Sequence, residues 1–156
     1  MDKIGTYHPD LILLHIGVND LEVTAPAASI TRGVQSVQAL IAAARGIPVM
    51  VGTLLPEIAG DYNAGAVNLI VPFNTQLVPA ATNAGARVVD LYSDIATDVT
   101  DWIAYDGLHP TEAGYQEISR VWFTSIRNAF ELPPSSPVTT SRRVRPNTIV
   151  RSGSKR

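Results

Sequence analysis

The stretch Leu11-Ile-Leu-Leu-His-Ile16, followed by Gly17-Val-Asn-Asp20, decides the class of fold that this chain adopts. A continuous apolar run ending at a glycine predicts a strand buried on both faces, and such strands occur in parallel sheets covered by helices. Ligands of open parallel sheets bind beyond the carboxyl ends of the strands, where Asn19 is expected. Asn19 is thus placed to donate its side-chain amide N–H to a substrate oxygen, although an Asn-Asp pair after a strand is more often a simple turn.

The rest of the chain alternates between helix-like and strand-like segments. Helical spacing of apolar residues marks 29–45, 65–83 and 111–130, and strand-length apolar runs occupy 48–55 and 87–91. This alternation predicts right-handed crossovers and a parallel sheet with helices on its faces. Residues 92–105 are polar and Asp-rich, and we expect them to form a loop.

Several residues predict where the helices begin, end or bend. Ser29 and Thr111 are expected to cap the first and last helices, because a hydroxyl oxygen can accept a backbone N–H of the first turn. Gly46 is expected to end the first helix. Pro72 and Pro79 remove backbone donors from the middle helix, which predicts a late start, a kink or both.

A second motif, Asp106-Gly-Leu-His109-Pro110, immediately precedes the last helix. A carboxylate three residues before a histidine, in a turn bounded by Gly and Pro, can fold back and accept the Nδ1–H of the imidazole. That contact holds one tautomer and leaves Nε2 to act as a general base. A capping Asp in a surface turn is the alternative interpretation of this spacing.

The two motifs together resemble a known family. His15-Ile-Gly-Val-Asn-Asp20, followed far downstream by Asp106-Gly-Leu-His109-Pro110 and Gly114-Tyr115, is similar to the SGNH (GDSL-type) hydrolase superfamily over residues 9–130. The motifs match its third and fifth conserved blocks, in the family's order. The continuation to Trp122 is most similar to the carbohydrate acetylesterase-like branch.

The resemblance implies both a fold and a function. The implied fold is a three-layer α/β/α, flavodoxin-like sandwich with a parallel sheet of strand order 2-1-3-4-5. The implied function is a serine esterase that hydrolyses acyl esters, acetyl esters of carbohydrates among them, or alternatively a lysophospholipase or thioesterase of the same fold. Asp106 and His109 would be the acid and base of the catalytic triad, and Asn19 an oxyanion-hole donor.

One departure from the family concerns the nucleophile. No Gly-Asp-Ser occurs in the chain, and the family's second block, which adds a Gly to the oxyanion hole, is also absent. Only strands three to five are therefore expected, with the strand at 11–16 left as a bare hydrophobic edge unless an upstream chain segment completes the sheet. A non-catalytic truncated remnant is the rival interpretation. Ser93 and Thr53 lie near strand ends, but neither has the elbow-like turn of a nucleophile.

Composition supports one domain with a distinct tail. The 156 residues include 46% hydrophobic ones, which suits a compact α/β chain. Residues 133–156 are Pro/Ser/Thr-rich, hold six of the 12 Lys and Arg and no acid, and are expected to be a disordered tail on a domain at 1–132. An acidic body argues against nucleic-acid binding.

Other classes of site have no support in the sequence. No apolar run approaches the ~20 residues of a membrane span. There is no Cys, the three His are dispersed and no HExxH is present, so neither a metal nor a cofactor is expected. His15, flanked by Leu14 and Ile16, is expected to be a hydrogen-bonded core histidine. The cellular compartment stays open.

Overall fold

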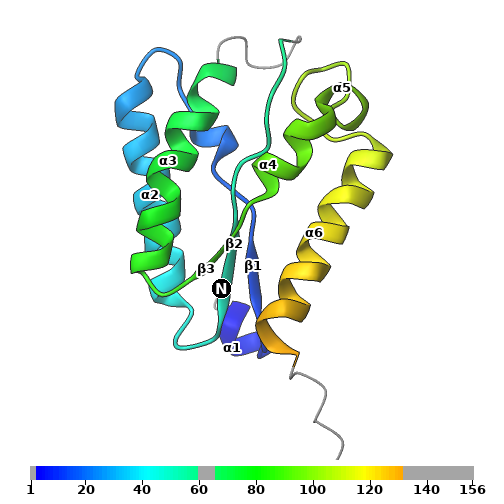
Figure 1. Ribbon diagram of the computed structural model, residues 1–156. Helices are drawn as coiled ribbons and strands as arrows, with labels where there is room; N and C mark the ends of the chain where they lie inside the picture. Colours follow the sequence, from blue (N-terminus) through cyan, green and yellow to red (C-terminus); the bar gives the residue numbers. More distant parts are fainter. Residues whose placement is uncertain (1–2, 60–65, 132–156) are drawn as a thin grey trace, which may run out of the picture.

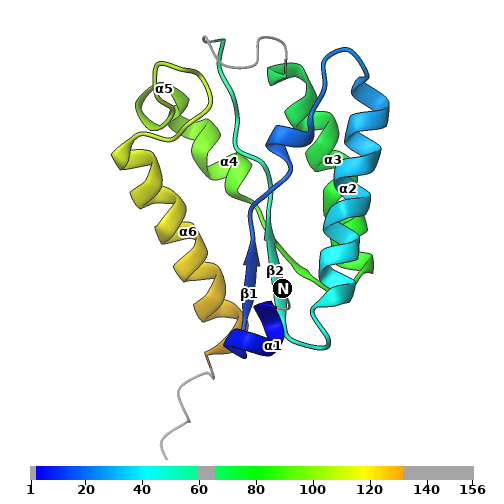
Figure 2. The same ribbon diagram turned by 180° about the vertical axis from the view of Figure 1, so that it is seen from behind.

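A computed structural model describes residues 3–59 and 66–131 of this chain as a three-layer α/β/α sandwich (Figures 1 and 2). Its middle layer is a parallel sheet of order β1-β2-β3, comprising β1 (Ile12–Leu14), β2 (Val49–Gly52) and β3 (Arg87–Val89). The long helices are α2 (Pro26–Ala43), α3 (Val67–Asn83) and α6 (Glu112–Phe130). The short ones are α1 (Lys3–Tyr7), η1 (Val18–Asp20), α4 (Leu91–Ile95), η2 (Ala96–Asp98) and α5 (Val99–Trp102).

Two hydrophobic cores lie on opposite faces of the sheet. Helices α2 and α3 cover one face, and α4 and α6 cover the other. Strand β2 is buried along its whole length, and its successive side chains point to opposite faces, so Val51 joins the α2–α3 core while Met50 joins the α6 core. The central strand is therefore the one that matches the pattern of a doubly covered parallel strand.

Strand β1 corrects one expectation. The run at 11–16 was expected to be buried on both faces, but β1 spans only Ile12–Leu14, none of its residues is buried, and Leu13 is 45% exposed. The reason is its position at the edge of the sheet, where β2 is its only partner strand within the described residues. The edge position itself agrees with the expectation that only strands three to five of the family's sheet are present.

The helix starts are partly as predicted. Thr111 caps α6, its Oγ1 accepting the Gly114 N–H at 3.1 Å. The predicted Ser29 cap of α2 is wrong, because the helix begins earlier, at Pro26, whose fixed φ suits a first helical turn. Ser29 is fully buried inside α2 and its hydroxyl donates to the Pro26 carbonyl at 2.9 Å.

Helix α3 begins at Val67, two residues after the start of the predicted segment, and continues through Pro72 and Pro79 to Asn83. Phe73 and Leu77, both fully buried, hold its apolar stripe against the core. Packing of this stripe outweighs the two lost backbone donors.

The segment 92–105 is not a loop, as its polar composition had predicted. It contains α4, η2 and α5. Leu91 and Ile95 lie four residues apart on α4 and are fully buried, and Ile103 is also in the α6 core. The Asp90 carboxylate caps α4 by accepting the Ser93 N–H at 3.0 Å. Helical apolar spacing therefore outweighs the Asp-rich composition.

Some expectations fall outside the described residues. The predicted tail at 133–156 and part of the predicted loop at 56–63 lie outside the residues that the structure describes. The structure therefore does not test the predicted domain boundary at residue 132. Within 3–59 and 66–131, no helix has both the length and the apolar character needed to cross a membrane.

Gly17 links the sheet to the residues beyond it and gives a test of the fold. Its φ of 119° lies in the left-handed region, and a Cβ there would come within 2.8 Å of Phe73 Cζ. We expect Gly17→Ala to lower the free energy of unfolding by roughly 2–4 kcal/mol, from backbone strain together with the clash in the core. Gly46→Ala is the matched control, because Gly46 has φ 86° with nothing within 4 Å of its Cβ position. If urea unfolding shows that both variants lose the same free energy of unfolding, contact with Phe73 does not restrict the residue at position 17.

Candidate active site

The motif at 106–110 forms a closed loop between α5 and α6. Ile103 and Pro110 form an antiparallel bridge, and the Ala104 N–H donates to the His109 carbonyl at 2.7 Å. Gly107 supplies the turn with φ 85°, a value that a residue with a side chain rarely adopts. The loop therefore holds His109 in a defined place just before the N-terminus of α6.

Asp106 folds back onto His109, as its spacing predicts. Its Oδ2 lies 2.6 Å from His109 Nδ1, while its Oδ1 accepts the backbone N–H groups of Leu108 and His109, both at 3.0 Å. The His109 hydrogen bond, followed by those two N–H groups, lowers the pKa of Asp106 to about 2. Asp106 is thus ionised at neutral pH, and its position orients the imidazole with Nδ1 toward the carboxylate.

The Asp106 pKa predicts a pH dependence. A lowered pKa means that this contact stabilises the fold fully above the ordinary value of 3.8 and loses its effect as the pH falls through about 2. We expect the carboxyl carbon of Asp106 to titrate near 2 in an NMR experiment, and closer to 3.8 in His109→Asn, which removes the largest cause of the shift. A wild-type midpoint near 3.8 would contradict the contact.

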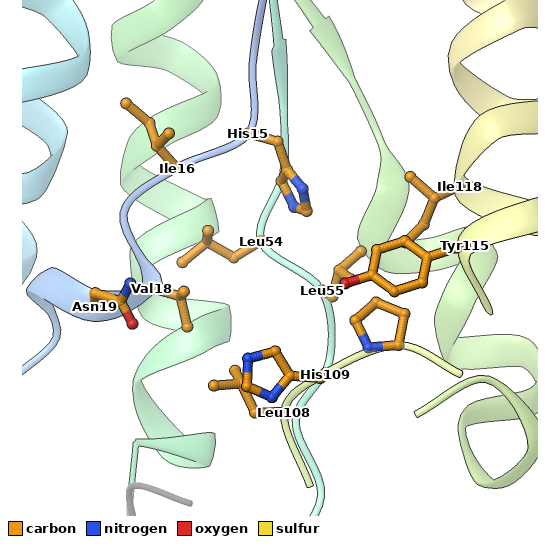
Figure 3. Close-up of a pocket in the computed structure, with 11 residues that line it drawn as sticks. His15, Ile16, Val18, Asn19, Leu54, Leu55, Leu108, His109, Tyr115 and Ile118 are labelled. Atoms are coloured by element: carbon orange, nitrogen blue, oxygen red, sulfur yellow. The ribbon is translucent and has the colours of Figure 1, made fainter. Parts of the chain in front are cut away.

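Asn19 and His109 line the same pocket, although they come from opposite ends of the described chain. Asn19 lies on η1, directly after β1, and His109 enters from the loop before α6 (Figure 3). The pocket has a volume of about 220 Å³. Its walls are mainly apolar and include Ile16, Val18, Leu54, Leu55, Leu108 and Ile118. It therefore lies beyond the carboxyl ends of β1 and β2, where open parallel sheets bind ligands.

Asn74 supports one wall of this pocket by binding the backbone of Leu54, a lining residue. It was not among the candidate residues of the sequence analysis. It lies on α3, is 9% exposed, and pairs with both backbone groups of Leu54: its Oδ1 accepts the N–H at 2.8 Å, and its Nδ2 donates to the carbonyl at 2.9 Å. The available signal was a polar residue within the apolar stripe of 65–83. This pairing fixes the chain after β2, where Leu54 and Leu55 face the pocket.

His15 is hydrogen-bonded, to the Thr53 backbone, as predicted, but it is not enclosed in the core. It follows the last residue of β1, is exposed as a residue, and lines the same pocket as His109 (Figure 3). Its ring nevertheless packs against the inner part of the sheet, with Cδ2 3.4 Å from the Cβ position of Gly52. Burial of the ring lowers the pKa of His15, and a hydrogen bond to the Thr53 backbone partly offsets that effect.

The two candidate substitute hydroxyls, Ser93 and Thr53, are engaged elsewhere. Ser93 Oγ donates to Asp90 Oδ2 at 2.6 Å, and Thr53 Oγ1 donates to Asp90 Oδ1 at 3.3 Å while accepting the Tyr92 N–H at 2.9 Å. Neither lines the pocket of Asn19 and His109, whose described lining contains no serine or threonine. The described residues also contain no group of three His, Cys, Asp or Glu side chains arranged to hold a metal ion.

Comparison with known proteins identifies the family. The model of the GDSL-like lipase/acylhydrolase family matches residues 1–117. The chain belongs to this family. Among curated relatives, the "Putative endoglucanase X" of Acetivibrio thermocellus is 28% identical over 77% of this chain and 51% of its own length. The multidomain esterase of Ruminococcus flavefaciens is 27% identical over 80% of this chain and 16% of its own. The chain thus spans about half or less of the length of these two curated relatives.

Solved structures support the same fold. The lipase/acylhydrolase from Enterococcus faecalis matches with a TM-score of 0.69 and 16% identity, over 82% of this chain and 66% of that chain. Axe2, an acetylxylan esterase from Geobacillus stearothermophilus, matches with a TM-score of 0.63 and 17% identity, over 80% of this chain and 62% of that chain. The parallel three-stranded sheet with its covering helices is therefore the GDSL-type α/β fold.

Proposed function

We propose that this chain supplies the base and an oxyanion donor of a serine-type esterase that hydrolyses small acyl esters, acetyl esters of carbohydrates among them. The observation that carries the proposal is that Asn19 and His109 line one pocket, with His109 bound through Nδ1 to the ionised Asp106. The acetylxylan esterase Axe2 and the multidomain esterase, both similar to this chain, make ester hydrolysis the natural chemistry for such a site.

In the proposed reaction, His109 Nε2 takes the proton of a hydroxyl as its oxygen attacks the ester carbonyl. The developing oxyanion accepts a hydrogen bond from the Asn19 amide, and Asp106 stabilises the imidazolium. His109 then returns the proton to the leaving alcohol oxygen. Water attacks the resulting acyl ester in the same manner, which releases the acid and restores the hydroxyl.

We further propose that the attacking hydroxyl comes from a chain segment that pairs with β1. No Gly-Asp-Ser is present in the sequence, and β1 pairs with β2 alone within the described residues. Leu13 on β1 and Ile16, two residues beyond its end, are 45% and 41% exposed, as expected of apolar residues next to a sheet edge that an added strand would cover. Such a segment would bring its serine to the carboxyl end of β1, beside Asn19.

The size of the pocket favours a small acyl group. A volume of about 220 Å³ accommodates an acetyl or similar chain, whereas a lysophospholipase or long-chain thioesterase requires an extended apolar channel. The test compares the turnover of p-nitrophenyl acetate and p-nitrophenyl decanoate by a protein in which a Gly-Asp-Ser block has been added to this chain. Faster turnover of the decanoate would favour the long-chain alternative.

The proposal is tested by restoring the missing block. The first strands of a GDSL family member, with their Gly-Asp-Ser, are fused ahead of Met1, and hydrolysis of p-nitrophenyl acetate is compared with that of the 156-residue chain. We expect turnover in the complemented protein that Ser→Ala in the added block abolishes, and near-background rates for the chain alone. A complemented protein that folds but stays at background would favour the non-catalytic remnant.

A further inference from the structure

We propose that His15 is a specificity-determining residue of this pocket, whose ring accepts a hydrogen bond from a hydroxyl on the alcohol part of the ester. The inference rests on the proposed esterase function and deepens it. It assigns a preference for esters of polyhydric alcohols, such as sugars, over esters of simple alkyl alcohols. Nothing in the reaction scheme above uses His15.

Packing fixes the orientation of the His15 ring. Gly52 leaves the space that the ring uses, because a Cβ there would lie 2.6 Å from Leu91 Cδ1, 2.9 Å from Trp122 Cζ2 and 3.4 Å from His15 Cδ2. The ring is thus wedged beside these side chains over the end of β2, and its other side faces the pocket (Figure 3). Its orientation is therefore set by packing.

The hydrogen bonding of the ring carries the second step. One ring nitrogen bonds to the Thr53 backbone, and burial of the ring lowers the pKa of His15 below its ordinary value of 6.5, which favours the neutral imidazole at the pH of 7.5 used below. In a neutral imidazole whose single N–H is given to a carbonyl, the second nitrogen can only accept. His15 consequently presents an acceptor to the pocket.

The surroundings of this acceptor carry the third step. The neighbouring walls formed by Ile16, Leu54 and Ile118 are apolar and cannot donate a hydrogen bond to it, and Tyr115 is the one residue in the described lining that carries a hydroxyl. Asn19 and His109 are assigned to the reacting carbonyl and hydroxyl. A hydroxyl beside the ester bond would donate to the His15 acceptor, whereas an ether oxygen in the same place could not.

The test uses two esters that differ in one donor: 2-hydroxyethyl acetate and its methyl ether, 2-methoxyethyl acetate. Their dissociation constants for the 156-residue chain are measured at pH 7.5 by NMR titration, which needs no turnover. We expect the hydroxyl ester to bind roughly 2- to 12-fold more tightly than the ether, the range of a single hydrogen bond. In His15→Phe, which retains ring volume without an acceptor, the ratio is expected to fall to about 1.

Three further variants separate the acceptor role from a structural one. His15→Leu is a second acceptor-free variant if the Phe variant does not fold. His15→Gln offers an amide oxygen as an acceptor and is expected to retain part of the preference. His8→Asn changes an exposed histidine that does not line the pocket, and should leave the ratio unchanged.

Equal binding of the two esters by wild type, or an unchanged ratio in the acceptor-free variants, would overturn the role of His15. The same pair of esters can be given to the complemented protein, where the ratio of kcat/KM replaces the binding ratio. Hydrolysis of neither ester there would contradict the proposed function, while the binding ratio still decides whether His15 is an acceptor.

Discussion

His109→Asn is expected to lower kcat for p-nitrophenyl acetate in the complemented protein by a factor on the order of 10⁴ or more. The substitution removes the proposed general base, and without it neither the attacking hydroxyl nor the water of the second step loses its proton. The His109 side chain is 56% exposed, so its loss should cost little stability. KM should change far less than kcat, because the imidazole acts on the transition state rather than on the bound ester.

The matched control for this variant is His8→Asn, the same replacement at an exposed histidine outside the pocket. Asn is suited to that position because His8 has φ 47°, in the left-handed region that Asn tolerates. Wild-type activity is expected for His8→Asn. A loss of less than about tenfold in His109→Asn, with the fold intact, would exclude His109 as the base.

Asn19→Ala is expected to lower kcat by about 10²–10³, the usual effect of removing one oxyanion-hole donor. The amide N–H is proposed to bind the oxygen only once it becomes an oxyanion, so KM should be nearly unchanged. Asn19 is exposed on a short 3₁₀ turn, and the variant should unfold at the same urea concentration as wild type.

Asp20→Ala is the neighbouring control, since Asp20 lies on the same turn but does not line the pocket. It should keep wild-type kcat. Equal losses of kcat in both variants would show that the turn as a whole is disturbed. An unchanged kcat in Asn19→Ala would show that Asn19 is not an oxyanion-hole donor.

The sequence located the candidate site more accurately than the surroundings of that site. Spacing placed Asn19 after a strand and predicted that Asp106 folds back onto His109, and the resemblance of the two motifs to the SGNH hydrolase superfamily implied their roles. Their meeting in one pocket follows from parallel strands, whose carboxyl ends share one edge of the sheet.

The missed features depend on contacts between distant parts of the chain. The exposure of Leu13 and His15 depends on how many strands flank β1, which the apolar pattern of 11–16 does not record. The pairing of Asn74 with Leu54 joins a helix to a strand end, and no local rule predicts it.

The most direct test of the central claim is labelling with a fluorophosphonate, which reacts with a serine that a neighbouring histidine activates. The account predicts no stoichiometric labelling of the 156-residue chain, and labelling at the Gly-Asp-Ser serine of the complemented protein that His109→Asn abolishes. Peptide mass spectrometry identifies the modified residue. Labelling of the complemented serine that survives His109→Asn, or His109-dependent labelling of a serine or threonine within the chain itself, would contradict it.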